Sequence, residues 1–132
     1  MINKIIEEID KSLESEAYLS ALSLVLILPD ICGKAEYNSN IKNKERYINW
    51  FDEYIGKYEQ SPFEGSNNPY LSGEVVYQLR CCFMHEGNPN INKNRIKNER
   101  NKIDKFILLI QKKNEFDIYL DSSSVITINE DY

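Results

Sequence analysis

Arg80 and His85 carry the most distinctive chemistry in this 132-residue chain, and His85 is its only histidine. Histidine both accepts and donates protons near neutral pH, and the planar guanidinium of arginine is a permanent cation that suits phosphate. In RNA the nucleophile for strand cleavage is the 2′-hydroxyl. An enzyme therefore needs only to remove its proton, stabilise the charged phosphorane and protonate the leaving oxygen. The two residues supply the minimum chemistry for RNA cleavage without a metal ion.

With one histidine per chain, only one of the two proton transfers has a side chain that can perform it. A symmetric dimer that places two His85 side chains in one cleft would supply the side chain for the other transfer, and we therefore expect a homodimer. Arg80 and His85 are five positions apart, about 140° around a helix, so they are not stacked neighbours. In the alternative interpretation the two residues do no chemistry. They then cap helix carbonyls or pair with a carboxylate, the candidates being Glu74, Glu86 and Asp30.

Helical periodicity of the apolar residues predicts the elements that position these two residues. We expect helices over residues 2–13, 17–28 and 43–59, and a fourth that begins near 68–69 or at Ser72 and stops at Gly87. The second is apolar almost all round, which is typical of the centre of a bundle, and Pro29 should end or kink it. The third carries an aromatic stripe, which we interpret as core packing in preference to a platform for base stacking. This stripe consists of Tyr47, Phe51, Tyr54 and Tyr58.

The residues after Gly87 change character twice. Residues 88–105 contain the one basic block of the chain, opposed only by Glu99 and Asp104. Such a block fits either a solvated surface or a phosphate-contacting role. Residues 106–110 then form a short apolar run, and residues 116–121 alternate apolar and polar side chains. With residues 125–128 as a third strand, this pattern predicts an antiparallel hairpin or meander against the helices. The cations that we assign to RNA binding are Lys93, Arg95, Lys97 and Arg100.

Length and composition narrow the classes of protein that fit. The predicted fold is mainly α and forms a single domain: a bundle of about four helices (1–87), the basic connector (88–105) and a β-hairpin with a tail (106–132). A net charge of −5 argues against a protein that coats nucleic acid or membranes over its whole surface. The acidic beginning of the chain and the short apolar run predict neither a secretion signal nor a membrane span, and hence a cytoplasmic protein. Three cysteines, two of them adjacent, favour reduced thiols over disulfides, and we expect no metal and no cofactor.

The run from Arg80 to His85, late in a predicted helix, resembles the R-x4-6-H motif of HEPN domains. These are helical bundles of prokaryotic toxins, abortive-infection systems and CRISPR-associated ribonucleases. Segments 28–33, 46–51 and 77–87 also resemble small HEPN-like proteins of Firmicutes and their phages, so the likeness covers about residues 17–87. It implies a dimeric, metal-independent endoribonuclease in a toxin–antitoxin or phage-defence setting, with RNA as substrate. It also implies a protein partner such as an antitoxin, a host protein or a phage protein. Arg80 and His85 would be catalytic, with Tyr77, Cys81 and Glu74 as supporting residues.

Cys81 departs from the pattern that the resemblance implies. Active HEPN proteins usually carry a polar residue, commonly Asn, Asp or His, directly after the motif arginine. A thiol donates hydrogen bonds only weakly. Cys81 therefore argues against catalysis by this chain more than it argues against the HEPN fold. Two functions therefore stay open. One is a protein that cleaves or binds RNA, and the other is a non-catalytic HEPN-like interaction module, an inhibitor or regulator encoded by a mobile element. The acidic net charge would suit a basic partner.

Overall fold

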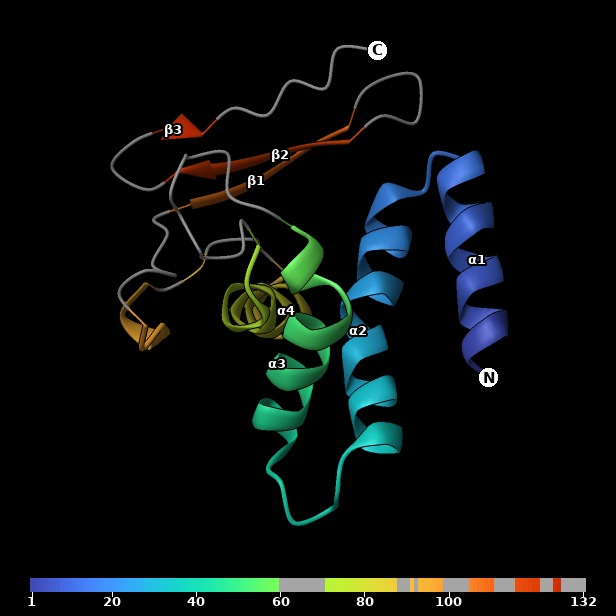
Figure 1. Cartoon of the computed structure of the whole chain (residues 1–132). Coiled ribbons are helices and arrows are strands. Elements are labelled where there is room, and N and C mark those ends of the chain that lie inside the picture. Colours follow the sequence, from blue (N-terminus) through green and yellow to red (C-terminus); the bar gives the residue numbers. More distant parts are fainter. Residues whose placement is uncertain are drawn as a thin grey trace.

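The computed structural model describes residues 1–59, 71–87, 91, 93–98, 105–110, 116–121 and 125–126, with only the backbone given for Lys93 and for the strands. This part of the chain is mainly helical, as predicted (Figure 1). The α-helices are α1 (Ile2–Glu14), α2 (Tyr18–Glu36), α3 (Asn43–Tyr54) and α4 (Gly73–Glu86). Short 3-10 turns lie at η1 (Gly56–Tyr58) and η2 (Lys93–Arg95), and the strands are β1 (Lys105–Ile110), β2 (Phe116–Asp121) and β3 (Val125–Ile126).

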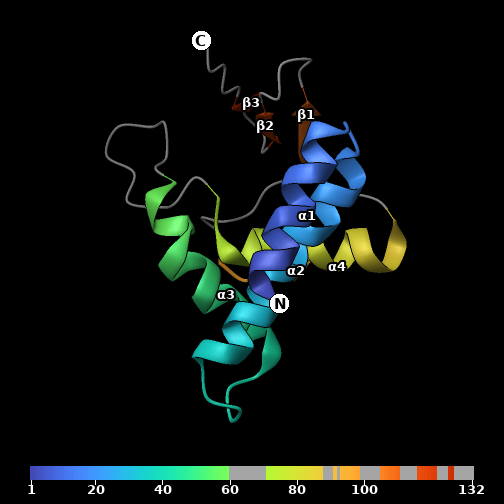
Figure 2. The ribbon, with the colours of Figure 1, turned by 90° about the vertical axis from the view of Figure 1, so that its right-hand side faces the viewer.

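The turn between α1 and α2 brings the two helices side by side in opposite directions (Figures 1 and 2). The amide of Ala17 donates to the carbonyl of Ser12 at 2.7 Å, and the amide of Glu16 donates to the carbonyl of Leu13 at 3.1 Å. These two bonds form the Schellman motif that ends many helices. Its left-handed position is occupied by Glu16, at φ 59°, where glycine is usually preferred.

Helix α2 continues through Pro29 to Glu36, so the prediction that it ends near residue 28 is wrong. A proline removes one helical hydrogen bond, but here α2 packs against α1, α3 and α4, and its contact with α3 continues past Pro29. Gly33 lies against α3 so closely that an added Cβ would stand 2.8 Å from the carbonyl oxygen of Arg46. Tertiary packing therefore offsets the lost hydrogen bond and keeps the second half of α2 helical.

The central position of α2 is confirmed, since it lies between α1 on one side and α3 and α4 on the other (Figure 1). Its expected burial on every side is not found. Leu19 is 71 % exposed and Val25 is 45 % exposed, because α2 has helical neighbours on only part of its circumference in the described chain. Its buried residues are Ala21, Leu26, Pro29 and Gly33.

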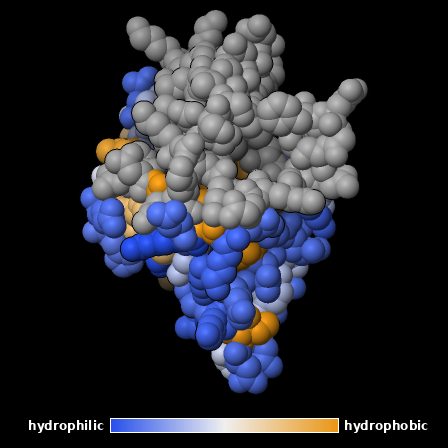
Figure 3. Space-filling model, turned by 90° about the vertical axis from the view of Figure 1, so that its left-hand side faces the viewer, coloured by the Kyte–Doolittle hydropathy of each residue, from blue (hydrophilic) through white to orange (hydrophobic). Residues whose placement is uncertain are grey.

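The core joins α2, α3 and α4 to the segment after α4. The aromatic stripe contributes Tyr47 and Phe51 to this core, as predicted. Tyr54, the last residue of α3, and Tyr58, which lies beyond its end, are exposed. The described surface on the side shown in Figure 3 is mostly hydrophilic, with small separate apolar areas. The buried core residues are Leu26, Tyr47, Phe51, Val75, Val76, Leu79, Ile91 and Ile96.

The three strands form one antiparallel sheet in the order β1-β2-β3. Lys105 pairs with Asp121 and Ile110 with Phe116 across β1 and β2, and Leu120 pairs with Ile126 across β2 and β3. These strands correspond to the predicted ones within a few residues. The predicted packing of the sheet against the helices lies outside the residues whose side chains are described.

Candidate functional site

Helix α4, which carries both motif residues, is fixed at each end by a distinct cap. At its start, the amide of Val75 donates to Oγ of Ser72 at 3.3 Å, and the amide of Gly73 donates to Oδ1 of Asp52 at 2.6 Å. At its end, Gly87 adopts the left-handed conformation at φ 67° and its amide donates to the carbonyl of Phe83. Ser72, one of the two predicted starts, and Gly87, the predicted stop, are therefore confirmed as caps.

One side of α4 is less buried than the other, and both motif residues lie on that side. Arg80 is half-buried at one edge of it, and His85 is exposed at the other edge. Between them lie Tyr77 and Cys81, which are half-buried, and Met84, which is 38 % exposed. We call these five residues the exposed face of α4. Figure 2 shows α4 lengthwise across the other helices. The opposite side of the helix is buried.

Arg80 is held at the surface by a carboxylate from α2. Its Nε donates to Oδ2 of Asp30 at 3.0 Å, and the Arg80 and Asp30 side chains are 23 % and 19 % exposed. Asn43, the first residue of α3, donates from Nδ2 to the other carboxylate oxygen at 3.2 Å. Partial burial by itself lowers the pKa of Arg80, but the charge and hydrogen bond of Asp30 raise that pKa above its ordinary value. The guanidinium is therefore a fixed cation with nitrogens besides Nε that can bind phosphate.

Two tyrosines near Arg80 pack against each other, Tyr47 on α3 and Tyr77 on α4. The rings of Tyr47 and Tyr77 meet edge to face with their centroids 5.3 Å apart, and the Tyr47 hydroxyl donates to the carbonyl of Leu26 at 2.8 Å. Burial raises the pKa of Tyr47 far above its ordinary value, with a further contribution from Asp30. Burial also raises the pKa of Tyr77, followed by a hydrogen bond with Cys81. Cys81 follows Tyr77 by four residues and adjoins Arg80, so the position that departs from the HEPN pattern lies on the same side of α4.

His85 stands apart from this network. It lies about 140° around α4 from Arg80 and ~7.5 Å further along the axis. Within the part of the chain that the structure describes, its ring makes no hydrogen bond or ion pair. One chain therefore presents Arg80 and His85 on the same exposed face without joining them.

The basic segment after α4 is anchored by apolar residues. Ile91 and Ile96 are buried in the core, and the amide of Lys97 donates to Oε1 of Glu74. This leaves Arg95 and Lys97 exposed on the surface. Glu74 lies eleven residues before His85, a rise of about 16 Å along α4. The described part of the basic segment therefore lies beside the first half of α4, where Glu74 holds it through the Lys97 amide.

Of the other predicted RNA-binding residues, Arg100 and the side chain of Lys93 lie outside the described residues. Among the described residues, no group of three or more histidine, cysteine, aspartate or glutamate side chains could hold a metal ion. The three cysteines, all among the described residues, are not joined by a disulfide.

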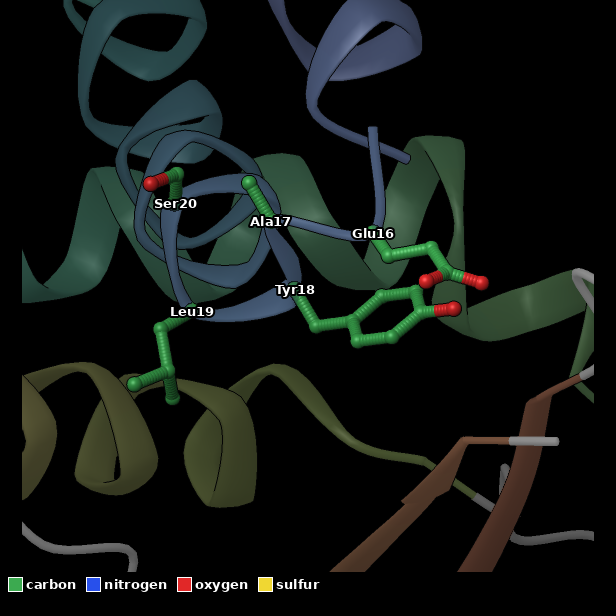
Figure 4. Close-up of a pocket in the computed structure, with 5 residues that line it drawn as sticks. All are labelled: Glu16, Ala17, Tyr18, Leu19 and Ser20. Carbon is green, nitrogen blue, oxygen red and sulfur yellow. The ribbon is translucent and has the colours of Figure 1, made fainter. Parts of the chain in front are cut away.

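A pocket of about 280 Å³ lies at the turn into α2, and neither motif residue lines it. Figure 4 shows that Glu16 and Tyr18 point to one side of it and Leu19 to another. It is lined by five consecutive residues and is an open surface depression with no cation or histidine, so it does not extend the site.

Because α2 does not stop at Pro29, it is longer than the sequence pattern indicated. With 19 residues, it is long and apolar enough to cross a membrane by length and composition. The core helix of a soluble protein and a signal sequence meet the same criterion, so these two properties alone do not assign α2 to a membrane.

A scan against models of protein families, a search of curated proteins and a search of solved structures each found no match. The HEPN resemblance therefore stays a prediction from the residues of this chain.

Proposed function

We propose that this protein is a HEPN-like, metal-independent endoribonuclease that acts on RNA as a homodimer in the cytoplasm. The observation that carries the proposal is the exposed face of α4, where Asp30 holds Arg80 and the His85 ring lies open to solvent. A phosphate-binding cation and an acid–base group thus share one accessible surface. The ion pair of Arg80 with Asp30 also fits a purely structural role, whereas His85 is exposed and has no such partner among the described residues, so His85 is the residue that favours chemistry.

Two copies of the exposed face complete the chemistry. One His85 removes the proton from the 2′-hydroxyl, and the resulting oxygen attacks the adjacent phosphorus. The His85 of the second copy then protonates the departing 5′-oxygen. Arg80 stabilises the charge that builds on the phosphorane oxygens. The products are one strand with a 2′,3′-cyclic phosphate and one with a free 5′-hydroxyl, and no metal ion enters the balance.

The two-copy arrangement agrees with the geometry of a single chain. Arg80 and His85 lie on one exposed face of α4, so a second α4 packed across this face would bring both residues of each copy into one interface. Met84, exposed between them, would supply an apolar contact for such packing.

The reaction class is tested by the ends of the products. The purified protein is incubated with a structured and an unstructured RNA in excess EDTA, and the termini are identified by mass spectrometry. We expect cleavage that EDTA does not suppress and products with 2′,3′-cyclic phosphate termini. Cleavage that requires a divalent cation, or products with 5′-phosphates, would contradict the mechanism. Glu86→Gln is a matched control, because Glu86 lies in the same turn of α4 as His85 and is exposed.

The second candidate function is a non-catalytic interaction module that binds a host, phage or antitoxin protein. The observation that favours it is the exposure of large apolar side chains on α2, with Leu19 at 71 % and Val25 at 45 %. Two results together would favour this function. The folded protein would cleave neither the structured nor the unstructured RNA, and it would form a complex with a purified basic partner that the Leu19→Asp variant does not form.

A further inference from the structure

Lys44, which no motif pointed to, lies beside the exposed face of α4. It is the second residue of α3, and its Nζ stands 5.7 Å from the centroid of the Tyr77 ring. This distance is within the range of a cation–π contact. Tyr77 precedes Arg80 by three residues, so the two lie about 60° apart on the same side of α4. Lys44 therefore lies over an aromatic ring of α4 that is on the same side of this helix as Arg80.

The ring that holds Lys44 is itself fixed. Tyr77 packs edge to face on Tyr47, which is 0 % exposed and is hydrogen-bonded to the backbone of α2 through Leu26. Packing on the buried Tyr47 side chain fixes the position of the Tyr77 ring. The cation–π contact with this ring in turn keeps the Lys44 side chain near α4. The ring face under the ammonium group is also occupied, which disfavours base stacking there.

The charge of Lys44 is not neutralised by a described neighbour. No carboxylate among the described residues lies within 4.0 Å of its ammonium group, whereas Lys11 pairs with Glu8 at 3.3 Å and Lys57 with Glu53 at 3.1 Å. Asn43, the residue before Lys44, instead orients Asp30, which holds Arg80. The first turn of α3 thus contributes to two cations. Asn43 orients Asp30, which holds Arg80, and Lys44 is itself the second cation.

We propose that Lys44 is a phosphate-binding residue of the RNA site and contacts the phosphate next to the one bound by Arg80. This inference rests on the proposed ribonuclease function and adds α3 to its substrate-binding surface. RNA bound in this way crosses from the exposed face of α4 to the start of α3, on the side of α4 where Arg80 lies. Lys44 makes a charge contact only, so its contribution is independent of the base sequence.

The test measures binding of a 2′-O-methyl oligouridine, which lacks the nucleophile and is not cleaved. Fluorescence anisotropy gives the dissociation constant as a function of salt concentration. Each phosphate contact to a single strand contributes about 0.7 to the slope of log K against log salt. We expect Lys44→Gln and Lys44→Met to lower this slope by about that amount and to weaken binding several-fold at low salt. Lys44→Arg should retain both the slope and the affinity.

Lys34→Gln is the matched control, because Lys34 is exposed near the end of α2. It should leave the slope unchanged. If the wild-type protein binds while Lys44→Gln and Lys44→Met keep its slope, the Lys44 proposal is overturned and the ribonuclease proposal stands. If the wild-type protein neither binds nor cleaves RNA, both proposals fail.

Discussion

Nε of Arg80 donates a 3.0 Å hydrogen bond to Oδ2 of Asp30, fifty residues earlier in the chain. This bond ties α4 to α2 at the point where Asn43 of α3 also contacts Asp30. Three helices therefore meet at a single carboxylate. The orientation of Arg80 therefore depends on a residue far from the motif in the sequence.

The first prediction concerns the coupling of this pair. Both side chains are less than one quarter exposed, and a hydrogen bond between charged groups in such a place contributes about 1.5–3 kcal/mol. We expect Asp30→Ala to lower the free energy of unfolding by about 2 kcal/mol. A double-mutant cycle with Arg80→Ala, measured by urea unfolding, should give a coupling energy above ~1 kcal/mol. Strictly additive effects would show that the two side chains do not interact.

The second prediction concerns the two left-handed helix ends. Glu16 has φ 59° and Gly87 has φ 67°. A side chain in this conformation costs about 1 kcal/mol relative to glycine. Glu16→Gly should therefore raise the free energy of unfolding by ~1 kcal/mol, and Gly87→Ala should lower it by a similar amount. Thermal unfolding of both variants checks the signs, and a change of the same sign in both would contradict the assigned conformations.

The third prediction concerns alkaline pH. Burial raises the pKa of Tyr47 well above its ordinary value of 10.0. The unfolded chain loses this proton as the pH rises through 10 while the folded chain keeps it, so the free energy of unfolding falls above pH 10. Tyr47→Phe should cost about 1 kcal/mol at neutral pH through the lost hydrogen bond to Leu26.

The same variant should also show a shallower fall above pH 10, because phenylalanine has no proton to lose. The measurement is urea unfolding at a series of pH values between 8 and 11. Equal slopes for the wild-type protein and Tyr47→Phe above pH 10 would contradict the buried, protonated hydroxyl.

Local signals in the sequence predicted the parts of the fold that local physics decides. The caps at Ser72 and Gly87 follow from the hydrogen bonds and backbone conformation of single residues. The burial of Tyr47 and Phe51 follows from helical periodicity. The pairing of Arg80 with a carboxylate was among the alternatives, with Asp30 as one of three candidates.

Other features depend on contacts between distant segments, and the sequence did not reveal them. The helix past Pro29 depends on packing against α3 at Gly33. The burial of Ile91 and Ile96 was not predicted, because each is a single apolar residue in a polar, basic segment and shows no periodic pattern. Lys44 is one of many lysines in the chain, and only the packing of α3 against α4 places it over Tyr77.

The central claim is that His85 performs acid–base catalysis on RNA. Its most direct test is the initial rate of RNA cleavage in excess EDTA by His85→Ala relative to the wild-type protein, with equal thermal stability of the two verified. General acid–base catalysis contributes about 10²–10⁴-fold to a rate. We therefore predict a fall of at least ~100-fold with no loss of stability, because His85 is exposed. Cleavage by His85→Ala at the wild-type rate would contradict the claim, and so would the absence of any cleavage by a folded wild-type protein.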